Sequence, residues 1–217
     1  MIAFCAANDK YFNLYFELWA DQMNKFYPEI EKRIAVYEPT QSIKNRCADK
    51  KIICVPAMLE DHRDNDGNPY PNKMFMLRWR NLPLVDDLVL ETQINCLPVK
   101  TQKFPKDNGG VEHLRLCRPK RGTLGGVSAA VFTPEACRKI VDVAKVMLYR
   151  APENDHPMNM WQEENLSFKL VQAEQQFKKV KGELNPDTYW ITAGTSQFWT
   201  PEEKLNILRH FANYKDE

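Results

Sequence analysis

The chain has 217 residues, of which 43% are hydrophobic and 27% charged, and its formal net charge is +1. This composition is typical of a folded globular protein and excludes disorder as the main state. A net charge near zero provides no global attraction for polyanions, so contact with nucleic acid would require a local basic patch. No stretch approaches the ~20 apolar residues that span a bilayer. The length predicts a single domain over residues 1–217.

The cysteines and the N-terminus predict a reducing compartment. Asp9 and Lys10 follow a short apolar run without a small-residue cleavage site, which argues against a signal peptide. The six cysteines form no CxxC motif, so their spacing does not indicate a zinc cluster. We expect a cytoplasmic protein whose thiols are reduced and mostly buried.

The first elements predict a βαβ unit. Residues 1–7 (MIAFCAA) are an apolar run typical of a buried parallel strand. Asn8 and Asp9 then supply a turn and a helix N-cap, and apolar residues recur at helical spacing over residues 11–26. A second strand follows at residues 33–37 (RIAVY). This order favours a parallel sheet.

The rest of the chain continues the α/β pattern. We expect strands at residues 51–55, 88–91, 113–117, 127–132 and 189–191. Residues 93–99 are expected to extend the strand of residues 88–91 past a kink. We expect helices at residues 73–81, 134–150 and 160–179, and a last one opened by Thr200-Pro201-Glu202. Residues 60–72 and 100–110 are polar loops.

Six strings occur in an order that resembles a known family. The stretch AFCAANDKYF precedes the first helix and RIAVYEP, and the lysine-bearing NKMFMLRW leads to LVLETQINCL. GGVSAAVFTPEACRKIV and ITAGTSQFWTPEEK follow. Together they resemble the GT-A glycosyltransferases, especially the glycogenin and bacterial galactosyltransferase type. The resemblance spans nearly the whole chain and implies a Rossmann-type mixed α/β sheet flanked by helices. It also implies transfer of a sugar from a nucleotide-sugar donor, most simply a UDP-sugar, to an acceptor hydroxyl.

The resemblance also implies a donor site. Its candidate residues are Ala6, Asn8, Asp9, Tyr11, Lys73, Arg78, Glu91, Gln93, Gly125, Gly126, Gly194 and Trp199. The loop after the first strand would hold the base and ribose, because ligands of open α/β sheets bind at the carboxyl ends of strands. Simpler interpretations stay open. One of Asn8 and Asp9 caps the helix, Gly125 and Gly126 make a turn, and Glu91 and Gln93 are a surface pair at a strand end.

The metal-binding motif of the family is altered in this chain. Glu91 and Gln93 stand where the family has the two aspartates of its Asp-x-Asp motif, and Ile191 stands at the position of its metal-binding histidine. Gln197 and Phe198 replace the lysine and proline of the C-terminal motif. We therefore expect donor binding with little or no metal, the diphosphate being neutralised by Lys73 and Arg78. In the alternative, Glu91 alone loosely holds Mn²⁺ or Mg²⁺.

Carboxylates near residue 160 are the candidate catalytic groups. By resemblance, Glu163 or Glu164 faces the sugar as base or as stabiliser of the anomeric centre, and Asp155 in the preceding loop is the substitute. Acids in the first turn of a helix also favour its dipole without any catalytic role.

The acceptor is open between a glycan, a lipid-linked sugar, a protein and a hydroxylated base in phage DNA. The basic residues Arg115, Arg118, Lys120 and Arg121 are the candidate phosphate contacts if the acceptor is DNA, and otherwise a solvated face. The absence of a membrane anchor weighs against a lipid acceptor. We also keep a non-catalytic scaffold of the same fold. A kinase or dinucleotide enzyme fits poorly, since neither a P-loop nor GxGxxG is present.

Overall fold

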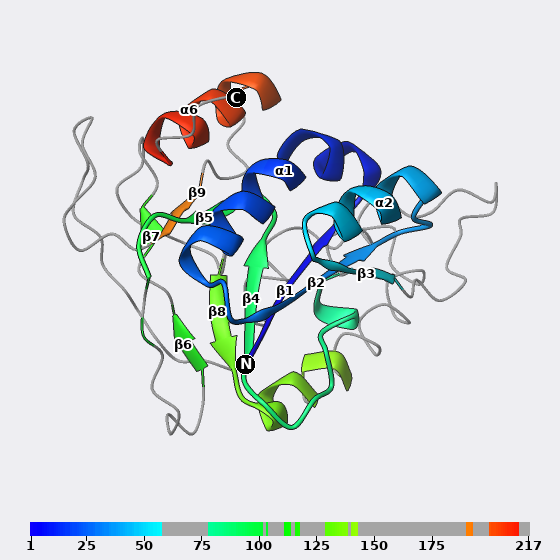
Figure 1. The fold of residues 1–217 in the computed structure, drawn as a ribbon. Coiled ribbons are helices and arrows are strands. Elements are labelled where there is room, and N and C mark those ends of the chain that lie inside the picture. Colours follow the sequence, from blue (N-terminus) through cyan, green and yellow to red (C-terminus); the bar gives the residue numbers. More distant parts are fainter. Residues whose placement is uncertain are drawn as a thin grey trace, which may run out of the picture.

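A computed structural model describes residues 1–57, 78–101, 103, 111–113, 116–117, 129–138, 140–142, 190–192 and 200–212. Its main feature is a six-stranded sheet of order β3-β2-β1-β4-β8-β6 (Figure 1). The strands are β1 (Ile2–Ala7), β2 (Glu31–Val36), β3 (Ile53–Pro56), β4 (Val89–Gln93), β8 (Ala129–Phe132) and β6 (Val111–His113). The first four in this order run parallel, and β8 is antiparallel to β4. The expected mixed α/β fold is confirmed.

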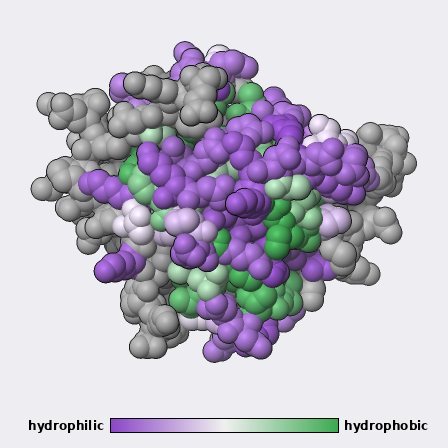
Figure 2. Space-filling model, viewed as in Figure 1, coloured by the Kyte–Doolittle hydropathy of each residue, from purple (hydrophilic) through white to green (hydrophobic). Residues whose placement is uncertain are grey.

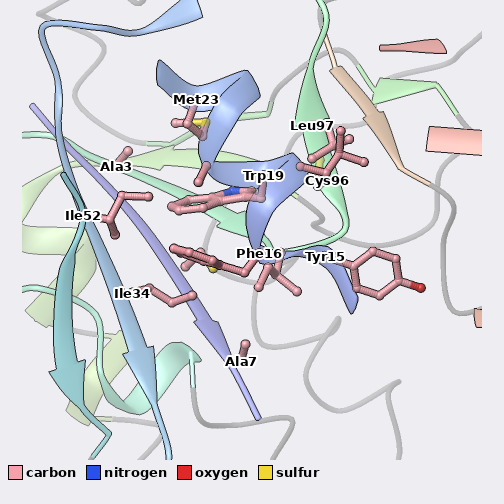
Figure 3. Packing of buried hydrophobic residues seen from close by; sticks show 14 of the residues in the cluster. Ala3, Ala7, Tyr15, Phe16, Trp19, Met23, Ile34, Ile52, Cys96 and Leu97 are labelled. Atoms are coloured by element: carbon pink, nitrogen blue, oxygen red, sulfur yellow. The ribbon is translucent and has the colours of Figure 1, made fainter. Parts of the chain in front are cut away.

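Helix α1 (Asp9–Phe26) connects β1 to β2 and covers one face of the sheet. Asn8 is its N-cap, because its side-chain oxygen accepts a hydrogen bond of 2.9 Å from the backbone N–H of Tyr11. The buried residues of α1 recur at helical spacing, as predicted. Figure 3 shows Phe16, Trp19 and Met23 lying against the strand residues of this face.

The alternation of side chains along the strands divides the core into two layers. Cys5, Leu90 and Ile34 belong to the cluster that packs under α1. Phe4 and Phe132 belong to a second cluster on the opposite face. Residues 78–80 and the helical residues 134–138 and 140–142 contribute to that second cluster, so helices cover both faces of the sheet. Both helical stretches fall within the predicted helices, the remainder of which lies outside the described residues.

Helix α2 (Gln41–Asp49) is an element that the sequence analysis did not predict. Thr40 caps its start, and its buried residues are only Ile43 and Cys47, which leaves a weak apolar pattern. The helix ends in a Schellman motif in which Lys51 adopts a left-handed φ of 57°. The backbone N–H of Ile52 donates to the carbonyl of Cys47 at 2.8 Å, and that of Lys51 to Ala48 at 2.9 Å.

Charged side chains join the outward surfaces of the two helices. Arg46 of α2 pairs with Glu17 of α1 at 2.9 Å, and Lys50 pairs with Asp21 at 2.6 Å. Figure 2 shows this face as mainly hydrophilic over α1 and α2. Such partly exposed pairs contribute little individually, so burial of the apolar faces of the two helices dominates their attachment.

A second sheet of three strands corrects two predicted elements. It consists of β5 (Cys96–Pro98), β9 (Trp190–Thr192) and β7 (Leu116–Cys117), in the order β5-β9-β7. The prediction that residues 93–99 extend β4 is wrong, because a turn at Ile94 and Asn95 redirects the chain into the new sheet. The prediction of one strand over residues 113–117 is also wrong, because β6 and β7 belong to different sheets.

Helix α6 (Pro201–Phe211) starts as predicted. Thr200 and Glu203 form a reciprocal capping box, with hydrogen bonds of 3.2 Å and 2.7 Å, and proline occupies the first turn. Leu208 and Ala212 are buried in the same cluster as α1, so α6 docks on that helix. Within the described part of the chain, no helix is long and apolar enough to cross a membrane.

Candidate functional site

The strand order places a topological switch point between β1 and β4. Connections from β1 lead to β2 and then β3 on one side, whereas β4 pairs with the other edge of β1. Ligands of open α/β sheets bind outside the carboxyl ends of strands at such a point. Ala6 of β1 lies directly opposite Gln93 of β4 there, and both residues are half-buried. The structure thus brings together two predicted site residues that are far apart in the sequence.

The loop after β1 adds polar and aromatic groups to the switch point. The N-cap bond uses the side-chain oxygen of Asn8 and leaves its amide nitrogen, with two N–H donors, outside the cap. Asp9 is exposed, and the Tyr11 side chain is 40% exposed. The Tyr11 ring lies 5.9 Å from that of Tyr15, whose burial raises its pKa to about 12. An amide, a carboxylate and an exposed ring are groups that hold a ribose and a base.

A buried ion pair lies two residues before the end of β4. Glu91 is 0% exposed and Arg78 is 7% exposed, and an oxygen of the carboxylate lies 3.5 Å from a guanidinium nitrogen. The guanidinium also lies 4.2 Å from the ring of Trp79. The interpretation of Glu91 as half of a surface pair is therefore wrong. A carboxylate at this depth is retained because a cation compensates its charge.

Glu91 and Gln93 of β4 face the same side of the sheet. Because side chains alternate along a strand, Glu91 and Gln93 share the face opposite α1, while Thr92 faces α1. The side chain of Thr92 accepts a hydrogen bond of 2.9 Å from the indole nitrogen of Trp19. Trp19 belongs to the predicted apolar face of its helix, but the partner of its indole nitrogen was not predicted from the sequence.

The described residues do not fit a divalent metal site. The positions that hold the metal in the family are Glu91, which faces a guanidinium, Gln93, which is a neutral amide, and Ile191. Ile191 is 1% exposed and pairs with Leu97 inside the small sheet. Hard cations require several oxygen ligands. Across the described ranges, no group of three or more histidine, cysteine or acidic residues comes together.

The buried thiols near this site are unreactive near neutral pH. Burial, and secondly the negative charge of Glu91, raises the pKa of Cys5 well above its ordinary value. Burial likewise raises the pKa of Cys137 to about 12. Neither thiol is thus a thiolate nucleophile near neutral pH. The expectation of free cysteines is confirmed for Cys5, Cys47, Cys54, Cys96 and Cys137, and of these five Cys54 is partly exposed and the others are buried.

Several predicted site residues lie outside the described residues. They are Lys73, Gly125, Gly126, Gly194 and Trp199 of the donor site, Asp155, Glu163 and Glu164 of the catalytic set, and Arg115, Arg118, Lys120 and Arg121 of the basic cluster. Their predicted roles stay predictions. The pairing of Arg78 with Glu91 was not anticipated, although a lone glutamate in an apolar strand signals that a buried cation must lie nearby.

The fold is that of the GT-A-type glycosyltransferases. No protein-family model and no curated protein matches the sequence. Among solved structures, the glycosyltransferase GlyE of Streptococcus pneumoniae TIGR4 matches with a TM-score of 0.54 and 7% identity, over 97% of this chain and 60% of GlyE. The galactosyltransferase LgtC, in complex with donor and acceptor sugar analogs, matches with a TM-score of 0.53 and 14% identity, over 98% of this chain and 95% of LgtC.

A third solved structure agrees with these two. The bifunctional glycosyltransferase WbbM, in its apo form, matches with a TM-score of 0.51 and 9% identity, over 98% of this chain and 49% of WbbM. This chain therefore spans about 60% of the length of GlyE and about half of WbbM. At sequence identities of 7–14%, the structural similarity shows a shared fold and nothing about activity.

Proposed function

We propose that the protein is a glycosyltransferase that moves a sugar from a nucleotide-sugar donor, most simply a UDP-sugar, to an acceptor hydroxyl. One observation carries the proposal. The switch point between β1 and β4 has Asn8, Tyr11 and Gln93 around it, in a fold shared with glycosyltransferases. Polar groups that gather where an α/β sheet binds ligands are the usual basis of a nucleotide site.

Each group at the switch point has a proposed task. The exposed Tyr11 ring stacks on the base, and the Asn8 amide hydrogen-bonds to the base or ribose. Gln93, which offers both a donor and acceptors, faces the sugar hydroxyls. Beyond the described residues, Lys73 assists with the diphosphate, while Glu163, Glu164 or Asp155 stabilises the reacting sugar. Because the metal positions are altered, we propose that activity depends weakly or not at all on Mn²⁺ or Mg²⁺.

The proposed acceptor rests on a basic cluster in the sequence. The basic residues over 115–121 favour an anionic acceptor, and a hydroxylated base in DNA satisfies this requirement. A glycan is the competing acceptor. Incubation of the protein and donor with each acceptor class, followed by mass measurement of the product, distinguishes them, because the added mass identifies both the sugar and its recipient.

A donor panel tests the proposal directly. Thermal unfolding is measured with UDP-, GDP-, CMP- and ADP-sugars. A ligand at one hundred times its dissociation constant stabilises the fold by ~2.7 kcal/mol, which raises the melting temperature by a few degrees. Tyr11→Ala removes most of this shift with the matching donor, whereas Tyr11→Phe preserves the stacking surface and the shift. A panel without any shift contradicts the proposal, and a shift without turnover favours the non-catalytic scaffold.

A further inference from the structure

We propose that the buried pair of Arg78 and Glu91 takes the place of a divalent cation, with Arg78 contacting the diphosphate of the donor. Glu91 then acts as a positioning residue that holds the guanidinium near the carboxyl end of β4. This inference rests on the proposed function, because it assumes a nucleoside diphosphate at the switch point. It assigns to the pair a role that differs from that of the acidic motif at the same place in the fold.

The charges of the pair lead to this assignment. An arginine keeps its proton in proteins, so Arg78, at 7% exposed, brings a permanent positive charge into the fold. Glu91, at 0% exposed, provides the compensating negative charge. Two buried opposite charges stabilise a fold no better than an apolar pair of similar size does. Stability alone therefore gives little reason for a buried ion pair at this position of the sheet.

The geometry of the contact suits a guanidinium that serves a second anion. The 3.5 Å between the two side chains exceeds the 2.7–2.9 Å of a charge-assisted hydrogen bond. The attraction is thus coulombic rather than a short bidentate bond. A guanidinium presents its N–H donors in one plane, and this planar geometry matches phosphate oxygens.

The aromatic surroundings hold the guanidinium in place. Its carbon lies 4.2 Å from the centre of the Trp79 ring, a cation–π contact. Trp79 is 0% exposed and meets the ring of Phe132 edge-on, with centroids 5.9 Å apart. Carboxylate and ring fix Arg78 between them, so little conformational entropy is lost when a phosphate binds. A cation placed at Glu91 would instead be repelled by the guanidinium.

Calorimetric titration of nucleoside diphosphates tests the inference. UDP, GDP, CDP and ADP are each compared with the corresponding nucleoside, which lacks the diphosphate, in EDTA and in Mn²⁺. The variants are Arg78→Gln, Arg78→Lys, Glu91→Gln and the double variant Arg78→Gln/Glu91→Gln. Arg138→Gln and Asp86→Asn are matched controls, because they make the same charge changes in an exposed ion pair of 3.7 Å on the surface.

We expect the wild-type protein to bind its diphosphate equally in EDTA and Mn²⁺. Arg78→Gln weakens that binding by about 10- to 100-fold and leaves the nucleoside unaffected, as the loss of a charge-assisted contact implies. Arg78→Lys, which keeps the charge, loses less. Glu91→Gln also weakens the binding of the diphosphate and leaves that of the nucleoside unchanged. The double variant binds the diphosphate as well as Arg78→Gln does, because Glu91 acts through Arg78. Both surface controls bind as the wild type does.

Loss of folding is separated from loss of binding by a second variant. Arg78→Met/Glu91→Leu removes both charges together, which buried pairs tolerate, so it should unfold like the wild type and still lose diphosphate binding. Diphosphate binding that requires Mn²⁺, that persists in Arg78→Gln, or that persists in this apolar variant overturns the inference and leaves the proposed function standing. If the wild-type protein binds none of the four diphosphates, the proposed function fails as well.

Discussion

The indole nitrogen of Trp19 donates a hydrogen bond of 2.9 Å to the side-chain oxygen of Thr92, from the middle of α1 to the carboxyl half of β4. Both residues are 0% exposed. Since alternate residues of a strand face opposite sides, a Thr92 side chain fixed toward α1 directs Glu91 and Gln93 toward the other face. One buried hydrogen bond thus links the first helix to the orientation of the candidate site.

Replacement of Thr92 by valine should destabilise the protein by about 1–3 kcal/mol, because the buried indole N–H loses its acceptor. Thr92→Ser keeps the hydroxyl and serves as the control, with a smaller loss. Urea unfolding monitored by tryptophan fluorescence measures both. Equal stability of the valine variant and the wild type would show that the bond contributes nothing.

Two N-caps that follow parallel strands provide a matched pair of variants. Asn8→Ala and Thr40→Ala each remove the side-chain cap of a helix that follows a parallel strand, at a cost of about 1 kcal/mol each. Only Asn8→Ala should also weaken nucleotide binding, because only Asn8 lies at the carboxyl end of β1. Asn8→Asp should keep the cap and lose the amide donors. Calorimetric titration of UDP and thermal unfolding separate these effects.

Alkaline pH should destabilise the fold through its buried thiols. Burial raises the pKa of Cys137 from 9.0 to about 12, so the native thiol stays protonated where that of the unfolded chain ionises. The unfolded state then binds fewer protons, and the free energy of unfolding falls as pH rises from 9 towards 12. Each such thiol contributes a slope of up to about 1.4 kcal/mol per pH unit.

Urea unfolding at pH 8, 9.5 and 10.5 measures this slope. Cys137→Ala should reduce the slope, whatever its effect on stability at pH 8. An unchanged slope in this variant would place the alkaline sensitivity elsewhere.

Restoring the histidine of the family at residue 191 should harm the fold without creating a metal site. Ile191 is 1% exposed and pairs with Leu97 in the small sheet. Burial of an imidazole there should cost about 2 kcal/mol or more, whereas Ile191→Val should cost about 0.5–1.5 kcal/mol. Chemical unfolding with and without Mn²⁺ provides the measurement, and stabilisation of Ile191→His by Mn²⁺ would contradict the prediction.

Glycine at residue 51 should stabilise the protein. Lys51 has a φ of 57° at the end of α2, where a side chain is sterically unfavourable and glycine is not. We expect Lys51→Gly to raise the free energy of unfolding by about 0.5–1 kcal/mol. Lys50→Gly is the control, because Lys50 has a φ of −88° and gains nothing from glycine. Thermal unfolding of the two variants measures the difference, and a Lys51→Gly variant no more stable than the wild type would contradict the prediction.

The parts of the fold that were predictable carry a strong local pattern. The apolar run of β1, the helical spacing of α1 and the Thr200-Pro201-Glu202 start of α6 each follow from short-range physics. Helix α2 was missed because its buried residues, Ile43 and Cys47, are too few to form a clear stripe. Its Thr40 cap, followed by apolar residues three and seven positions later, was the available signal.

Long-range pairing explains the remaining errors. Periodicity along one segment does not reveal that the chain after Gln93 enters a different sheet, because that depends on β9 as a distant partner. In the candidate site, the positions of Ala6, Asn8 and Gln93 followed from their place at the carboxyl ends of strands. The partner of Glu91 could not be predicted, because an ion pair between separated segments has no signature in the local sequence pattern.

The small sheet has a consequence for the order in which the protein is made. Among the described strands, the one that pairs with β5 is β9, and Tyr27 at the end of α1 stacks on Trp190 of that late strand, with ring centroids 5.6 Å apart. A nascent chain that has completed β1, α1 and β4 therefore still exposes apolar surface on the ribosome. The core under α1 becomes complete only after synthesis has passed β9 and α6, because residues of both elements belong to that core.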